Sequence, residues 1–165
     1  MPDVSLRTDE AVVHALKTYG NTILRLSYSY LHNLSDSEDI LQDTLLSLIH
    51  NEPCFSSPEH EKAWLMRVAI NLCKNKLKSS WFKTVEIPED FPDDGMADDE
   101  SEVLEAVNRL PVKYREVVHL FYYEGYSTFK ISSLLRKKES TIRSLLHRSR
   151  EMLKTSLKGA YDFDE

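Results

Sequence analysis

Hydrophobic residues recur at helical spacing through most of the chain. In the first half they predict a long helix over residues 9–32, a second after residue 35 and a third over residues 64–77. The buried face of the first helix is predicted to hold Leu16, Tyr19, Ile23, Leu26, Tyr30 and Leu31. No alternating apolar run is bounded by a hairpin signal, and the chain has only four glycines. The pattern therefore predicts an all-α fold.

The second and third helices each carry a polar stripe opposite their apolar positions. Ser35-Asp36-Ser37-Glu38 forms a capping box that predicts the start of the second helix. The outer stripe of this helix combines acid, amide and leucine: Asp39, Gln42, Asp43 and Leu46. It suits docking on a basic partner helix, although a lone exposed leucine needs no such explanation. The third helix has one basic and amide stripe, which suits a phosphate backbone: Arg67, Asn71, Lys74, Asn75 and Lys78.

The second half of the chain predicts a helix, a short helix, a tight turn and a longer basic helix. Leu110-Pro111 opens the first of these, and Ser127 or Thr128 can cap the short one. The longer helix lies within RKKESTIRSLLHRSREMLK, where Ser140 or Thr141 can cap it and Leu145 is assigned to packing. Basic residues on one amphipathic helix fit a solvated face equally well. The order of elements, however, is that of a helix-turn-helix, whose last helix enters the DNA major groove.

The formal net charge of −6 is unevenly distributed along the chain. Residues 84–108 contain ten Asp or Glu and no Lys or Arg, whereas residues 109–160 contain twelve Lys or Arg against four Glu. Prolines and a glycine interrupt the acidic stretch, so it is predicted to be a flexible linker. The expected organisation is a helical domain over residues 1–83, an acidic linker over 84–104 and a helix-turn-helix domain over 105–165. Each domain presents a basic patch suited to nucleic acid.

Composition excludes several classes of protein. The two cysteines, Cys54 and Cys73, form no C-x-x-C motif, so neither a disulfide framework nor a structural zinc site is indicated. No stretch approaches the roughly 18 apolar residues of a membrane span, and no signal-peptide pattern opens the chain, so we expect a cytoplasmic protein without membrane insertion. No nucleophile and base arrangement is recognisable. We expect no metal, no cofactor and no enzymatic activity.

Three stretches in their order along the chain resemble one family. DSEDILQDTLLSL, AWLMRVAINLCKNKLK and LPVKYREVVHLFYYEGYSTFKISSLLRKKESTIRSLLHRSREML are similar to the extracytoplasmic-function sigma factors. These are small two-domain subunits with which bacterial RNA polymerase recognises promoters. The resemblance covers nearly the whole chain and implies sigma region 2-like and region 4-like domains. It also implies three partners: core RNA polymerase, promoter DNA and an anti-sigma factor.

The resemblance assigns roles to individual residues. It implies that the stripe of Asp39, Gln42, Asp43 and Leu46 docks on the clamp helices of the polymerase's largest subunit. In the minus-ten element, a loop over residues 53–61 would capture a flipped base and the third helix would hold the non-template strand. Those contacts would come from Pro53, Ser56, Ser57, His60, Arg67, Asn71, Lys74, Asn75 and Lys78. The helix-turn-helix would read the minus-thirty-five element with Arg136, Lys137, Lys138, Ser140, Thr141, Arg143, Ser144, His147, Arg148 and Arg150.

Departures from the family pattern leave two alternatives open. In the family, the turn before the last helix commonly contains glycine, whereas this chain has residues 136–140 without glycine. The family also commonly has a basic residue at the position of Leu145. One alternative is a sigma-like mimic that sequesters an anti-sigma factor without binding promoters, but such a mimic needs no basic groove face. The other is a stand-alone helix-turn-helix regulator, which leaves the first domain without a purpose.

Overall fold

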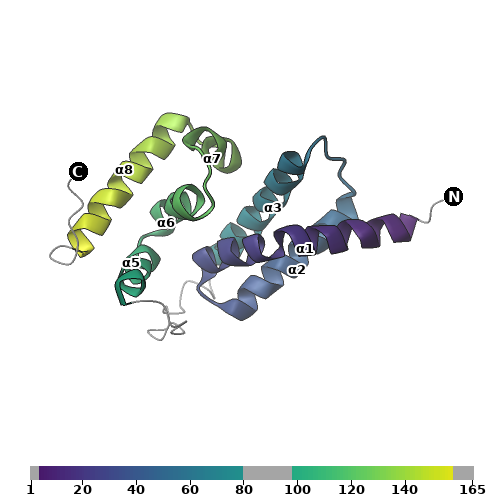
Figure 1. Ribbon diagram of the computed structural model, residues 1–165, viewed down its shortest axis with the longest axis horizontal. Coiled ribbons are helices and arrows are strands. Elements are labelled where there is room, and N and C mark those ends of the chain that lie inside the picture. Colours follow the sequence, from purple (N-terminus) through teal and green to yellow (C-terminus); the bar gives the residue numbers. More distant parts are fainter. Residues whose placement is uncertain (1–3, 80–97, 158–165) are drawn as a thin grey trace. The chain divides into compact units, whose positions relative to one another are not determined.

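The computed structural model describes residues 4–79 and 98–157, and within these ranges every regular element is a helix (Figure 1). This confirms the predicted all-α fold. The chain divides into two compact units, Met1–Val85 and Glu86–Glu165. Most of the predicted linker, residues 84–97, lies outside the described residues, as do Trp81 and Phe82.

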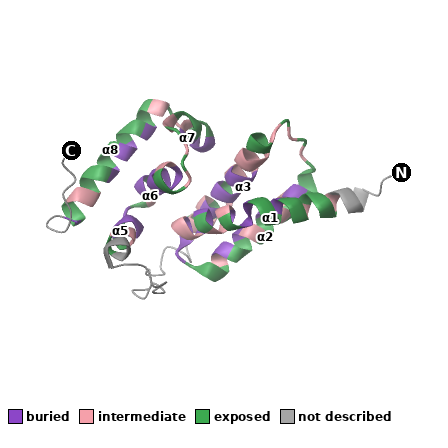
Figure 2. Ribbon diagram, viewed as in Figure 1, coloured by how far each residue is buried: buried purple, intermediate pink, exposed green. Residues whose placement is uncertain are grey.

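Over residues 4–79, the first unit is a bundle of three helices. They are α1 (Val4–Leu31), α2 (Leu34–Asn51) and α3 (Pro58–Lys78), and each contacts the other two. Figure 2 shows buried residues on each of the three helices. The largest buried side chains are Ile23, Leu26, Tyr30, Leu65, Met66 and Ile70. The prediction for the buried face of α1 is confirmed except at Leu16, which is 45% exposed.

The helix starts in this unit differ from those predicted. Asn33, not Ser35, is the N-cap of α2: its Oδ1 accepts the Asp36 N–H at 2.9 Å, and its carbonyl accepts the Ser37 hydroxyl at 2.7 Å. Ser37 is thereby buried inside the helix instead of forming part of a cap. Helix α3 begins six residues before the predicted start, because Ser57 caps it and Pro58 suits its first turn.

Within residues 98–157, the second unit has four α-helices and one π-helical turn. They are α5 (Asp98–Asn108), α6 (Val112–Val118), η1 (His119–Tyr123), α7 (Thr128–Leu135) and α8 (Glu139–Ser156). Helix α8 contacts α5, α6 and α7, and the shared core holds Val117, Leu120, Ile131, Ile142 and Leu146. Ser127 caps α7 as expected, since its hydroxyl accepts the Lys130 N–H. The N-cap of α8 is Lys138, without a side-chain cap, so neither Ser140 nor Thr141 serves as predicted.

Helix α5 corrects the predicted extent of the acidic linker. The linker was expected to run to residue 104, but the chain is helical from Asp98. Ala106 and Val107 of this helix are buried, and the helix packs on α6 and α8. Apolar contacts on one face therefore stabilise a helix whose charges lie elsewhere. Arg115, only 5% exposed, holds the helix end by donating from Nη1 to the carbonyls of Leu110 at 2.8 Å and Asn108 at 3.3 Å.

Candidate nucleic-acid and protein interfaces

The outer stripe of α2 is exposed along its whole length. Its four predicted members, Asp39, Gln42, Asp43 and Leu46, all face solvent, and Leu46 is 52% exposed. Ile40, Thr44 and Leu48 occupy the buried side of the same helix, which accounts for the separation of the two faces. Sequence reasoning missed Ile49, which is 40% exposed and follows Leu46 by three positions. The stripe therefore offers two carboxylates, an amide and two aliphatic side chains.

The segment between α2 and α3 is organised around His60. The Ser56 N–H donates to His60 Nδ1 at 3.2 Å, and the His60 N–H donates to Ser57 Oγ at 3.1 Å. The Phe55 ring meets the His60 ring at 5.4 Å and the Trp64 ring at 5.8 Å between centroids, edge to face in both pairs. The structure thus brings Ser56, Ser57 and His60 together and places His60 in the first turn of α3 instead of a loop. Phe55 was missed by sequence reasoning.

Helix α1 fixes the start of α3 from the other side. The Tyr19 hydroxyl donates to the Pro58 carbonyl at 3.2 Å, and His14 Nε2 lies 3.2 Å from Glu61 Oε1. Burial, followed by the neighbouring Glu61 carboxylate, raises the pKa of Tyr19, so the hydroxyl remains a proton donor well above neutral pH. These contacts join residues that are 39 and 47 positions apart in the sequence. They hold in place the cluster of Ser56, Ser57 and His60. Neither was apparent from the sequence.

The basic and amide stripe of α3 lies partly in solvent. Asn71, Asn75 and Lys78 are exposed, whereas Arg67 and Lys74 are half-buried. Lys76 lies outside this stripe and pairs with Asp36 of α2, with Nζ 3.0 Å from Oδ1. The stripe therefore keeps amide and ammonium donors available at its exposed positions, while Lys76 joins α3 to α2.

Three basic residues form the turn between α7 and α8, and they differ in their surroundings. Arg136 is exposed and adopts a left-handed backbone with φ 55° and ψ 45°. Lys137 Nζ lies 3.6 Å from Oε1 of Glu116, a carboxylate with a side chain only 2% exposed. Lys138 is exposed and has an ordinary φ of −63°. Arg136 and Lys138 can therefore meet a phosphate directly, whereas Lys137 also neutralises a buried charge.

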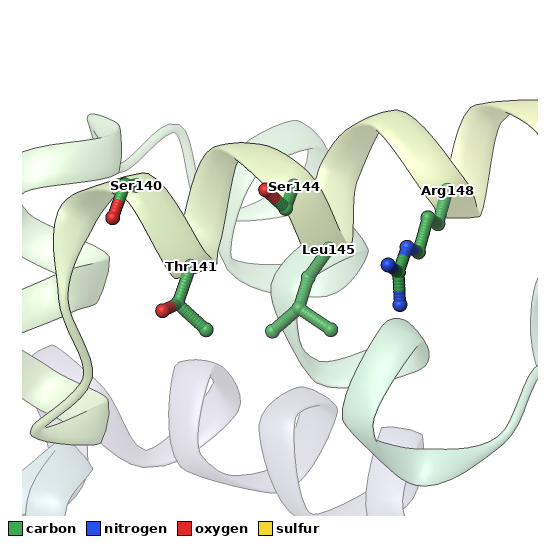
Figure 3. Close-up of a pocket in the computed structure, with 5 residues that line it drawn as sticks. All are labelled: Ser140, Thr141, Ser144, Leu145 and Arg148. Atoms are coloured by element: carbon green, nitrogen blue, oxygen red, sulfur yellow. The ribbon is translucent and has the colours of Figure 1, made fainter.

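One face of α8 carries a shallow hollow of about 280 Å³. Figure 3 shows the five residues that line it, with Thr141, Leu145 and Arg148 pointing to the same side of the helix: Ser140, Thr141, Ser144, Leu145 and Arg148. A hydrogen bond from Arg148 lowers the pKa of Tyr114 on α6, which places the guanidinium against that phenol. Leu145 is buried, as its assignment to packing predicted, yet it still lines the hollow.

A second face of α8 carries Arg143, His147 and Arg150, all exposed. Arg143 Nη1 lies 3.3 Å from Glu139 Oε1, and Glu139 also accepts the Thr128 hydroxyl at 2.8 Å.

Arg150 on that face rests on two aromatic rings. It donates from Nε to the Tyr122 hydroxyl at 2.6 Å and lies over the rings of Phe121 and Tyr122. The second face is thus a set of arginines whose positions are fixed by neighbouring groups. Sequence reasoning identified the arginines but not the aromatic partners that position Arg150.

Two negative findings apply to residues 4–79 and 98–157 only. No three His, Cys, Asp or Glu side chains come together there in a way that would hold a metal ion. In the same part of the chain, no helix is apolar over a length that would cross a bilayer.

Comparison with protein families matches both units. The family model described as sigma-70 region 2 matches residues 15–83, and the model described as sigma-70 region 4 matches residues 100–153. Together the two matches cover more than two thirds of the chain.

Individual relatives cover most of the chain. RNA polymerase sigma factor SigV of Bacillus subtilis is 23% identical over 91% of this chain and 93% of its own length. ECF RNA polymerase sigma factor SigW of the same organism is 25% identical over 90% of each chain. ECF RNA polymerase sigma factor SigL of Mycobacterium tuberculosis is 29% identical over 74% of this chain and 75% of its own.

Two solved structures share the fold. The sigma factor RpoE, in complex with the anti-sigma factor NepR from Bartonella quintana, has a TM-score of 0.72 at 22% identity. The comparison covers 90% of this chain and 97% of that one. CnrH, in complex with the cytosolic domain of CnrY, has a TM-score of 0.68 at 18% identity and covers 96% and 97%. These likenesses support the all-α architecture of both units.

Proposed function

Because this chain belongs to the extracytoplasmic-function sigma factors of the sigma-70 family, we propose that it binds bacterial core RNA polymerase and directs initiation at a subset of promoters. The observation that carries the proposal is the pairing of two units in one chain. One presents an exposed acidic and aliphatic stripe, and the other is a helix-turn-helix with exposed arginines on its last helix. A specificity subunit needs both a surface for the enzyme and a surface for DNA. The chemistry of RNA synthesis then belongs to the polymerase core, in keeping with the non-catalytic role of this family.

The polymerase contact is assigned to α2. Asp39, Gln42, Asp43 and Leu46 share one exposed face, and Ile49 extends it by a turn. Carboxylates on the rim of an aliphatic centre suit a basic helix of the partner, because apolar burial supplies affinity while opposite charges set orientation. The partner surface is the clamp helices of the largest subunit.

The minus-ten contact is assigned to the His60 cluster and the polar stripe of α3. Opening a promoter requires a base to leave the stack, which costs a few kcal/mol of stacking and pairing unless a protein pocket replaces those contacts. Pro53, Ser56, Ser57 and His60, just before and within the first turn of α3, would supply such contacts. Ser57 Oγ already accepts the His60 N–H, so its hydroxyl proton is available for donation to a base. Arg67, Asn71, Lys74, Asn75 and Lys78 would hold the displaced strand through its phosphates.

The minus-thirty-five contact is assigned to α8 and the turn before it. Ser140, Thr141, Ser144 and Arg148 line the hollow and would meet base edges. Arg136, Lys137, Lys138, Arg143, His147 and Arg150 flank that face and would meet phosphates, which fixes register without reading sequence. One of the similar solved structures is a sigma factor in complex with an anti-sigma factor, and we extend an anti-sigma partner to this chain on the same ground.

Reconstituted transcription tests the proposal. Core polymerase with and without the full chain is given genomic DNA, and run-off products are sequenced to reveal new start sites. We expect new starts that share two elements about 25 base pairs apart. Polymerase binding without new starts would support the mimic, and promoter binding without polymerase binding would support a stand-alone regulator.

A charge-reversal variant tests the polymerase surface in the same system. Asp39→Arg with Asp43→Arg should abolish new starts by weakening the complex, because both side chains are exposed on the docking stripe. Asp9→Arg with Glu10→Arg reverses the same number of exposed charges on α1, outside the stripe, and should leave binding unchanged. Equal losses in the two double variants would mean that net charge, not this surface, governs association.

A further inference from the structure

We propose that Leu145 reads the 5-methyl group of one thymine in the minus-thirty-five element. This inference rests on the proposed function, since it requires α8 to lie in the major groove. It concerns the apolar member of the hollow on α8, whose other lining residues are Ser140, Thr141, Ser144 and Arg148. The inference names a specificity-determining residue in place of a packing residue.

The lining residues share one helical face. Positions i, i+1, i+4, i+5 and i+8 from Ser140 lie together in an α-helix, and Figure 3 shows the Leu145 side chain between those of Thr141 and Arg148. The hollow of about 280 Å³ is several times the ~30 Å³ that one water occupies in the liquid. A base edge and its exocyclic groups can therefore enter it. The face that admits them carries hydroxyls, one guanidinium and one aliphatic side chain.

Each of these groups has a different counterpart in the major groove. Hydroxyls bond to either donors or acceptors, and arginine selects the O6 and N7 acceptors of guanine. Thymine is the base that presents a methyl group there, and an aliphatic carbon is the protein group that recognises it. Among the residues that line the hollow, Leu145 and the methyl group of Thr141 offer such a surface, and Leu145 is the one that is held by packing.

Burial makes Leu145 suitable for this contact. The residue is 8% exposed, so most of its side chain packs against the unit and its remaining surface is held in one position. The Leu145 carbonyl also accepts the Ser149 hydroxyl at 2.7 Å, as well as serving the helix. A methyl group placed against it therefore orders no flexible side chain, and conformational entropy lost on binding is small. An exposed, mobile leucine would discriminate less.

The test removes one methyl group from the DNA and nothing from the protein. The holoenzyme, formed from core polymerase and the full chain, is titrated onto a promoter found by run-off sequencing. Each thymine of the minus-thirty-five element is replaced in turn by deoxyuridine, which lacks only the 5-methyl group. At one position we expect about a fourfold loss of affinity, which corresponds to the ~0.8 kcal/mol of a buried methylene-sized group. The other positions should change little.

Protein variants then assign the effect to a residue. With Leu145→Ala the affinities for thymine and deoxyuridine at that position should become equal, whereas Thr141→Ser, which keeps the hydroxyl and removes the other methyl group on that face, should keep the fourfold difference. A thermal melt of each variant shows that the unit is folded. Promoter binding with no methyl-sensitive position, or sensitivity that persists in Leu145→Ala, would overturn this inference alone. Failure to bind any promoter would overturn the proposed function, and this inference with it.

Discussion

Replacing Arg136 with glycine is expected to make the second unit more stable and its DNA binding weaker. Arg136 holds a left-handed backbone with φ 55° at the end of α7. That conformation costs a residue with a Cβ roughly 1–2 kcal/mol. Glycine avoids this cost but loses ~0.5–1 kcal/mol more conformational entropy on folding. The net gain is therefore about 0.5–1 kcal/mol. The N–H groups of residues 136 and 137 both donate to the Ser132 carbonyl, and glycine retains these main-chain hydrogen bonds.

Lys138 provides the matched control in the same turn. It is also exposed and basic, but its φ of −63° is ordinary for any residue. Lys138→Gly therefore gains nothing from relief of strain, and because glycine is well tolerated at the N-cap position that Lys138 occupies, we expect little change in stability. Both variants remove one positive charge. If both side chains meet phosphates, each should reduce the slope of log affinity against log salt by about 0.9.

Thermal unfolding of the full chain measures the difference. The two tryptophans, at positions 64 and 81, belong to the first unit, so fluorescence follows that unit and circular dichroism follows both. For a domain of this size, 1 kcal/mol shifts Tm by roughly 4–8 °C. We expect Arg136→Gly to raise the Tm of the second unit by ~3–6 °C and Lys138→Gly to change it little. Equal shifts in the two variants would refute the argument from backbone strain.

Two further changes probe single interactions. Glu139→Gln should raise DNA affinity and increase the salt slope by about 0.9, because the amide oxygen can still accept the Thr128 hydroxyl while Arg143 is released from its ion pair; an unchanged slope in salt titrations would show that Arg143 does not meet phosphate. Burial raises the pKa of the Cys73 thiol to about 12, so the unfolded chain ionises this group first and the free energy of unfolding of the first unit should fall as pH rises above ~9. Urea titrations from pH 8 to 11 should show a smaller decline in Cys73→Ala, and an identical decline would assign the effect to other groups.

Helix periodicity was the most informative signal in the sequence, and its failures have local causes. The stripes of α2 and α8 follow from spacing alone, because a helix that buries one side must expose the other. The N-cap of a helix is less certain, because several nearby residues can have suitable side chains and only the one at the first non-helical position before the helix can serve. Ser35 has the right chemistry, but Asn33 precedes it and takes the role. Helix α5 was missed because the prediction of a linker relied on the average composition of the segment. A helix can pack through one apolar face even when its average composition is acidic, and in α5 that face holds Ala106 and Val107.

Contacts between elements were beyond what the sequence could predict. The ion pair of Arg143 with Glu139 follows the i, i+4 rule and could have been anticipated. The bond between Arg150 and Tyr122 joins residues 28 positions apart, and Lys137 reaches Glu116 across the unit. Such pairs depend on how helices pack, which no local pattern specifies. They matter for function because they determine which Lys and Arg side chains can contact phosphate and which are held by other protein groups.

Helix α5 also sets a limit on promoter geometry. Arg115 fastens its end to α6, so the packed helices described in the second unit begin with Asp98 of α5. About 19 peptide steps separate Asp98 from Ser79 at the end of α3. Whatever path these residues take, they can span at most about 65 Å. Two elements whose centres are 25 base pairs apart are separated by ~85 Å along straight B-DNA. The width of the units themselves, or a bend in the DNA, must supply the remaining ~20 Å. The length of the connecting segment therefore limits the distance between the two elements, and promoter affinity should fall more steeply when that distance is lengthened than when it is shortened.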